Sequence, residues 1–182
     1  MGTLIDMRPN STYTSSLLQL MESMGTDELA VVEVGVYRGQ GTKCFLDSGK
    51  VKKIYCIDPW ISGYDPTDIA SSTDMVAVEA DFDKRVGDDD RVVKLKGTLQ
   101  QHAKFLSEIG VDVVYIDACH QYESTKDDIE TAVEIVKPKI AVCGHDYVKN
   151  WSGVVKAVDE VVGKPDRIFG DYSWVKYLTT RT

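Results

Sequence analysis

Short apolar runs alternate with segments of helical spacing along this chain. The runs are four to six residues long and predict buried strands at residues 29–34, 53–57, 91–96, 111–116 and 140–143. Apolar residues that recur every three to four positions predict helices at residues 12–24, just after Thr42, and at 73–86, 100–109, 124–136 and 154–162. The last stretch, residues 167–180, has two strand-like pieces around Gly170-Asp171 and predicts a hairpin. This alternation, without a repeat or linker, predicts one three-layer α/β domain over residues 1–182 with a mostly parallel sheet.

The strongest local signal is the stretch 29–42, LAVVEVGVYRGQGT. An apolar run ends at Gly35, Gly39 and Gly41 follow, and Thr42 opens an amphipathic segment. A strand that turns on glycines into a helix is typical of a nucleotide-like ligand site, because the backbone can approach the ligand closely. The spacing is GxxxGxG, which differs from the GxGxxG pattern of dinucleotide-binding folds. An ordinary strand–turn–helix unit is the alternative interpretation.

Polar residues follow five of the predicted strands at the point where each one ends. Since ligands of open α/β sheets bind beyond the carboxyl ends of the strands, we expect these residues to converge on one rim. Asp58 lies about twenty positions after the glycine turn, where an acid can accept hydrogen bonds from ribose hydroxyls, although Asp-Pro is also common in turns. The residues expected on the rim are Glu33, Gly35, Asp58 with Pro59 and Trp60, Gly97 with Thr98, Asp117 with His120, and His145 with Asp146.

Three expectations concern the segments beside this rim. Pro59 and Trp60 are expected to offer the ligand a flat apolar surface, and Gly97-Thr98 to contact its adenine side. The polar segment 61–72 is the best candidate for a mobile lid. Ser124 and Asp127 fit a capping box at the start of a helix.

Charge and cysteine content narrow the class of protein. A net charge of −8 and a pI near 4.9 argue against binding of polymeric nucleic acid, which requires cations to displace counterions. Four dispersed cysteines without a CxxC pair indicate reduced thiols, a cytosolic protein and no zinc cluster. The first fourteen residues lack the pattern of a signal peptide, Asp6 breaks a myristoylation motif, and no apolar run is long enough to cross a bilayer.

Two motifs make the chain resemble class I S-adenosylmethionine-dependent methyltransferases. EVGVYRG, starting at Glu33, resembles a variant of their first motif, and IDACHQYE…KPKI…GHDY resembles the branch that includes antibiotic and macrolide-sugar O-methyltransferases. The resemblance covers roughly residues 27–150. Ala118-Cys119 and Lys139-Ile140 depart from it, at the pocket floor and at a turn.

The resemblance implies a Rossmann-like fold with a mostly parallel seven-stranded sheet that ends in an antiparallel hairpin. It also implies methyl transfer from S-adenosylmethionine to a small-molecule hydroxyl, such as that of a sugar or polyketide. The residues expected to bind the cofactor are Glu33, Gly35, Val36, Tyr37, Gly39, Asp58, Pro59, Trp60, Gly97, Thr98, Asp117 and Ala118.

The resemblance leaves two chemistries open. Asp117, His145 and Asp146 match the positions of metal ligands, and the histidine tilts that site from Mg²⁺ towards a transition metal. Without a metal, Asp117, His120 or His145 is the candidate general base.

Two other function classes remain as alternatives: a nicotinamide-dependent oxidoreductase, which the missing GxGxxG disfavours, and a non-catalytic nucleoside-binding module. The chain is short for a methyltransferase, so we expect an acceptor pocket that is open or completed by a second copy in a homo-oligomer.

Overall fold

A computed structural model describes residues 11–178 of this protein, and the expectations for the first ten residues lie outside it. The helices and strands follow the predicted alternation. The helices are α1 (Ser11–Glu22), α2 (Gln40–Asp47), α3 (Met75–Val86), α4 (Leu99–Ile109), α5 (Tyr122–Glu130) and α6 (Ser152–Val161). The strands are β1 (Leu29–Val34), β2 (Val51–Asp58), β3 (Val92–Lys96), β4 (Val113–Ile116), β5 (Ala141–Gly144), β6 (Arg167–Ile168) and β7 (Trp174–Tyr177). Short 3-10 turns cover Ile69–Ser72 and Lys149–Trp151, and a π-helical turn, Thr131–Val136, extends α5.

The strands form one seven-stranded sheet in the order β3-β2-β1-β4-β5-β7-β6. Strands β1 to β5 run parallel to one another, whereas β7 runs antiparallel to both β5 and β6. This confirms the predicted mostly parallel sheet with a terminal hairpin. The order reverses between β1 and β4, which is where open α/β sheets bind their ligands.

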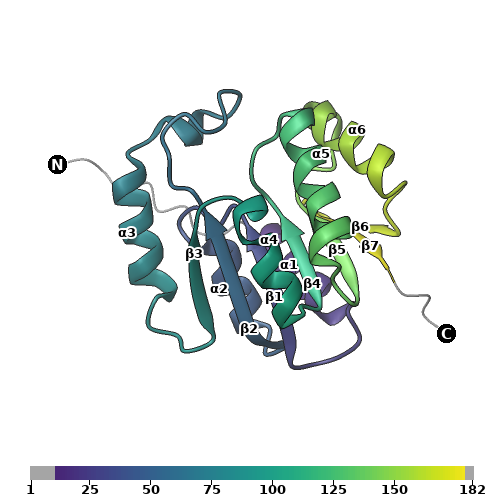
Figure 1. The fold of residues 1–182 in the computed structure, drawn as a ribbon, viewed down its shortest axis with the longest axis horizontal. Coiled ribbons are helices and arrows are strands. Elements are labelled where there is room, and N and C mark those ends of the chain that lie inside the picture. Colours follow the sequence, from purple (N-terminus) through teal and green to yellow (C-terminus); the bar gives the residue numbers. More distant parts are fainter. Residues whose placement is uncertain (1–10, 179–182) are drawn as a thin grey trace.

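Helices cover both faces of the sheet (Figure 1). Strand β1 shows why, because Val31 belongs to the core under α1, α2 and α3, and Val32 to the core under α4, α5 and α6. A strand with apolar residues on both sides needs a helix layer on each face. Glu33 follows Val31 on the α2 side, so its carboxyl group is directed into a buried layer.

The expected capping box at Ser124 and Asp127 is wrong. Helix α5 begins one turn earlier, because the Gln121 carbonyl already accepts a hydrogen bond from the Thr125 N–H at 2.9 Å. A capping box forms instead at α4, where the Gln101 side chain accepts from the Thr98 N–H at 2.9 Å. Helix α1 ends two residues short of the predicted Met24.

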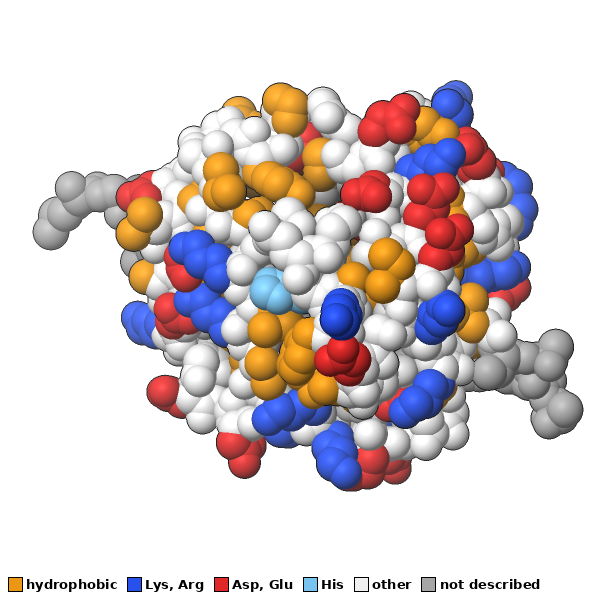
Figure 2. Space-filling view, in the orientation of Figure 1, with side chains coloured by type: hydrophobic (Ala, Val, Ile, Leu, Met, Phe, Trp, Pro, Cys, Tyr) orange, Lys and Arg blue, Asp and Glu red, His pale blue; other side chains and the backbone are white. Residues whose placement is uncertain are grey.

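The surface carries charges of both signs. Acidic and basic side chains are interspersed on the face shown in Figure 2, and apolar side chains gather at its upper part, where segment 61–72 lies. Ile61, Tyr64 and Ile69 of this segment are exposed. All four cysteines are buried free thiols. No helix within residues 11–178 has the length and apolar character needed to cross a membrane.

Candidate active site

The glycine turn after β1 is built for close contact between two strand ends. Gly35 has a φ of +87°, which favours glycine, and a Cβ at this position would overlap the main chain of Asp117 after β4. Gly39 has a φ of 77° and starts α2. Gly35 is therefore required for the approach of β1 to β4, a reason that the ligand-based interpretation of the motif did not include.

Asp58 connects the glycine turn to the end of β2. Its carboxylate accepts the Tyr37 N–H at 2.9 Å and the Trp60 N–H at 2.7 Å. Burial raises the pKa of Asp58, and these two hydrogen bonds oppose that shift. The sequence predicted that Asp58 lies at the end of this strand. The structure adds that its carboxylate holds the backbone of the surrounding turn in place.

Trp60 lies elsewhere than expected. Its ring is buried, packs against Phe82 of α3 with 5.3 Å between centroids, and donates from Nε1 to the Tyr37 carbonyl at 3.0 Å. The ring does not line either cavity at the glycine turn, whereas Pro59 does. The Trp60 ring is therefore packed in the core and not displayed as an open surface, and its predicted contact with the cofactor remains a prediction.

Glu33 is a carboxyl group in an apolar layer. It is 2% exposed, and the Thr42 hydroxyl donates to its Oε2 at 2.5 Å. Burial raises the pKa of Glu33 to about 8, against the opposing hydrogen bond from Thr42. Glu33 is therefore mostly protonated near neutral pH.

Three side chains from the ends of β4 and β5 converge beside this turn. Asp117, His120 and Asp146 place one ligand atom each within 4.8 Å of one another, and His120 Nε2 lies 2.9 Å from Asp146 Oδ2. The indole of Trp151 stacks on the His120 ring at 4.1 Å. Two carboxylates and an imidazole in this arrangement can hold a divalent cation or move a proton.

The residue that sequence reasoning missed is Asp65, in the segment predicted as a lid. Its side chain is 5% exposed, and its Oδ2 lies 2.8 Å from both the backbone nitrogen and the Nδ1 of His120. Burial by itself would raise the pKa of Asp65, but the hydrogen bonds from His120 and Thr67 lower it to about 2. No periodicity marks residue 65, so only an acid near Pro66 in a polar stretch could have been noticed.

The charges of this cluster depend on one another. Burial alone would lower the pKa of His120, but hydrogen bonds to Asp146 and Asp65 outweigh it and raise the pKa to about 9. Burial alone would raise the pKa of Asp146, and the hydrogen bonds from His120 and His145 lower it. Burial raises the pKa of Asp117, and the charge of Asp146 adds to this. The imidazole is thus held between two ionised carboxylates.

His145 is only partly in this cluster. Its Nδ1 lies 3.1 Å from Asp146 and 4.0 Å from Asp117, while its buried Nε2 has no hydrogen-bond partner among residues 11–178 and lies 3.7 Å from Asp171. The group that the geometry brings together contains His120 where the sequence predicted His145 as a metal ligand. His145 packs edge-on against Tyr13 of α1, at 5.7 Å between centroids.

Two cavities meet at Gly35, Tyr37 and Asp117. One, of about 550 Å³, is lined on its acidic side by Glu33, Asp117 and Asp171, with Val36 in its wall. The other, of about 360 Å³, contains Asp58, Asp65, Ala118, His120, Asp146 and Trp151. Gly39, Gly97 and Thr98 line neither cavity, although the Gly97 N–H donates to the Asp58 carbonyl at 3.0 Å. The predicted cofactor contacts of these three residues remain predictions.

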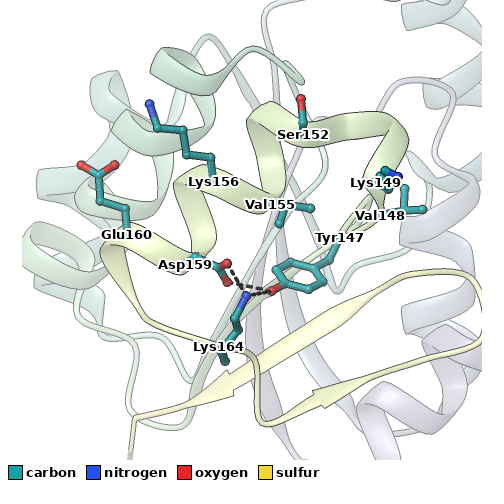
Figure 3. Close-up of a pocket in the computed structure, with 9 residues that line it drawn as sticks. All are labelled: Tyr147, Val148, Lys149, Ser152, Val155, Lys156, Asp159, Glu160 and Lys164. Carbon is teal, nitrogen blue, oxygen red and sulfur yellow. Dashed lines mark hydrogen bonds and ion pairs between the residues drawn. The ribbon is translucent and has the colours of Figure 1, made fainter.

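A further depression of about 780 Å³ lies along α6, away from this chemistry (Figure 3). Three of its polar groups pair with one another, since the Tyr147 hydroxyl donates to Asp159 at 2.7 Å and Lys164 contacts both. Neither the aspartate–histidine cluster nor the glycine turn lines it, so we do not assign the reaction to it.

Comparison with known proteins identifies the family. Residues 32–147, well over half of the chain, match the model of a methyltransferase domain. The chain belongs to this family. It is a class I S-adenosylmethionine-dependent methyltransferase, and this decides against the oxidoreductase and the non-catalytic module that the sequence left open.

A curated relative and several solved structures are also similar to this chain. An uncharacterised protein, R132 of Acanthamoeba polyphaga mimivirus, is 25% identical over 88% of this chain and 71% of its own length. The TDP-rhamnose 3'-O-methyltransferase CalS11 of calicheamicin biosynthesis has 19% identity and a TM-score of 0.61, over 93% of this chain and 81% of its own. An O-methyltransferase from Bacillus cereus, solved in complex with SAH, has 13% identity and a TM-score of 0.61, over 91% and 79%. At these identities the solved structures show a shared fold.

Proposed function

We propose that this methyltransferase transfers a methyl group from S-adenosylmethionine to a hydroxyl of a small-molecule acceptor. The observation that carries the proposal is the convergence of Asp117, His120 and Asp146 in a cavity that Gly35 and Asp58 also line. CalS11 and the Bacillus cereus protein are O-methyltransferases, and O-methylation requires a group that accepts the hydroxyl proton.

The larger cavity suits the cationic part of the cofactor. S-adenosylmethionine, when bound, supplies a methyl group on a positively charged sulfonium and carries an ammonium group. Asp117 and Asp171 line that cavity and favour positive charge there, and Glu33, which is mostly protonated in the free protein, can add a charge by ionising beside a cationic ligand. Asp58 lies in the adjoining cavity, and each of its oxygens accepts one backbone N–H and retains a lone pair for a ribose hydroxyl.

The aspartate–histidine cluster would act on the acceptor. In this assignment the neutral form of His120, which a pKa of about 9 makes available at alkaline pH, takes the hydroxyl proton at Nε2, and Asp146 stabilises the resulting positive charge. The same oxygen and nitrogen atoms fit a divalent cation, which Asp117, His120 and Asp146 would hold. Such an ion lowers the pKa of a bound hydroxyl.

Calorimetric titration with S-adenosylmethionine tests the cofactor assignment. We expect micromolar binding by the wild type, loss of binding in Asp58→Ala, and unchanged binding in Asp127→Ala, which removes the same charge from the exposed side of α5. Folded wild-type protein that does not bind the cofactor would overturn the proposal.

Methyl transfer is then measured against a panel of sugar and polyketide hydroxyls, with Mg²⁺, with Mn²⁺ and with a chelator. Activity lost in chelator and restored by one ion would assign the cation, and equal activity in all three conditions would assign proton transfer by His120 alone. Methylation of amines only would refute the hydroxyl acceptor.

A further inference from the structure

Asp65 makes more hydrogen bonds to the site than a loop anchor requires. Its Oδ1 accepts from the Thr67 N–H at 2.8 Å and the Thr67 hydroxyl at 2.6 Å, both within its own turn. Its Oδ2 is committed to His120, 55 positions further along the chain, through the backbone N–H and ring Nδ1. One oxygen thus orders the segment and the other reaches the catalytic cluster.

The bond to Asp65 decides which way the His120 ring faces. An ionised carboxylate can only accept hydrogen bonds, so the ring nitrogen beside Asp65, Nδ1, must carry a proton. Nε2 is directed at Asp146 and at the cavity, and beside this second carboxylate it also carries a proton while the ring is charged. Trp151, stacked on the ring at an interplanar angle of 21°, restricts its rotation.

We propose that Asp65 is a positioning residue, which fixes the orientation of the His120 ring so that Nε2 faces the acceptor side of the cavity. The proposal rests on the proposed function for its effect on the reaction, whether His120 takes a proton or binds a cation. A carboxylate that orients a histidine ring in this way serves both kinds of site. It also makes segment 61–72 part of the active site, because that segment delivers Asp65.

The first test reads the histidine directly and needs no cofactor. The chain has three histidines, so ¹⁵N-labelled imidazole spectra can be assigned with a His120→Gln variant. We expect Nδ1 of His120 to be protonated throughout in the wild type, and its signal to move towards the unprotonated position in Asp65→Ala. A wild-type Nδ1 without a proton, or an unchanged spectrum in Asp65→Ala, would overturn the proposal.

The second test separates positioning from folding. Asp74→Ala is the matched control, since Asp74 caps α3 through Val76 and Ala77 and does not contact His120. We expect Asp65→Ala to lower kcat about 100-fold while the dissociation constant of S-adenosylmethionine changes less than 3-fold, as a group acting through the histidine requires. Asp74→Ala should change kcat less than 2-fold despite its own loss of stability.

Two further variants cover a folding failure of Asp65→Ala. Asp65→Asn keeps the shape and one acceptor but not the charge, and we expect kcat between that of the wild type and that of Asp65→Ala. Thr67→Val removes a bond from Oδ1 only and should leave the His120 spectrum unchanged. Equal loss of kcat in Asp65→Asn and Asp74→Ala would reduce Asp65 to a structural anchor. If the wild type fails to bind S-adenosylmethionine, the proposed function fails. The imidazole spectra still show whether Asp65 holds the proton on Nδ1 of His120.

Discussion

Glu33 and Asp65 are both buried carboxyl groups beside the two cavities, yet their surroundings are opposite. Glu33 lies in an apolar layer with the Thr42 hydroxyl as donor, and its pKa is raised to about 8. Asp65 accepts four hydrogen bonds, two of them from His120, and its pKa is lowered to about 2. Both side chains are nearly inaccessible to solvent, but Glu33 lies deep in the apolar layer, where desolvation decides its charge state, whereas Asp65 lies nearer the surface, where its hydrogen-bond donors decide it.

The difference suggests that the two acids have separate roles in two regions: the first region is the larger cavity with Glu33, and the second is the smaller cavity with Asp65 and His120. A protonated acid such as Glu33 can ionise when a cationic ligand arrives, whereas Asp65 keeps a fixed charge that orients a histidine. The four predictions below test this division, beginning with the largest expected effect.

Replacing His120 should remove most of the catalytic power of the second region without affecting the first. We expect His120→Gln to lower kcat about 10²- to 10⁴-fold, the usual contribution of a general acid–base group, with little change in S-adenosylmethionine affinity. His102→Gln is the control, because His102 bonds only the Lys96 carbonyl, at 3.1 Å, outside both cavities. Steady-state kinetics and calorimetry check this. A variant that loses cofactor affinity and keeps kcat would contradict the division.

Gly35→Ala should damage both regions together, because they meet there. The added Cβ would overlap the Asp117 main chain and occupy a backbone with a φ of +87°, so we expect a loss of about 4 kcal/mol in unfolding free energy. Gly49 has a φ of +71° and open space around it, so Gly49→Ala should cost only the backbone strain, about 1 kcal/mol. Urea denaturation measures both. Equal costs would mean that the contact between β1 and β4 is loose.

Glu33→Gln should make the protein more stable and a weaker cofactor binder. The folded pKa of about 8 exceeds the unfolded value of 4.5, so wild-type stability falls as pH rises between these two values. The glutamine cannot ionise, so its unfolding free energy should not show this fall. The difference in unfolding free energy between the variant and the wild type should therefore be about 3 kcal/mol larger at pH 7 than at pH 4, in favour of the variant. Denaturation at several pH values measures this gain.

Calorimetry in buffers of different ionisation enthalpy measures the accompanying proton. We expect the wild type to release about one proton on binding S-adenosylmethionine at pH 7, and Glu33→Gln to release none and bind about 10-fold more weakly. An unchanged proton count would show that Glu33 does not respond to the ligand.

Thr42→Val should produce the smallest effect. It removes the hydroxyl donor of Glu33, so the pKa of Glu33 should rise further and unfolding free energy should fall by about 1 kcal/mol. Thr125→Val is the control, since the Thr125 hydroxyl is also buried but donates to the Cys119 carbonyl at 2.8 Å. The upper end of the pH–stability profile should move only in Thr42→Val.

The sheet and the strand-end residues could be predicted because their signals are local. The central strands β1, β4 and β5 are buried by the helices on both faces and therefore appear as apolar runs, and the carboxyl ends of parallel strands must meet at one edge. Asp58, Asp117, His120 and Asp146 line one cavity, as this placement predicts. The predicted helix start near Ser124 was wrong, because the helix already begins with the backbone hydrogen bond from Thr125 to Gln121.

What the sequence by itself determined is the doubly covered sheet, the glycine turn and the rim of acids and histidines, since periodicity and turn chemistry act over a few residues. Only the tertiary structure decided that Trp60 turns into the core, that Asp65 reaches His120, and that Glu33 holds a proton. Segment 61–72 has no periodic signal, so its position follows from contacts with distant residues. A pKa depends likewise on solvent exclusion and on donors from other elements.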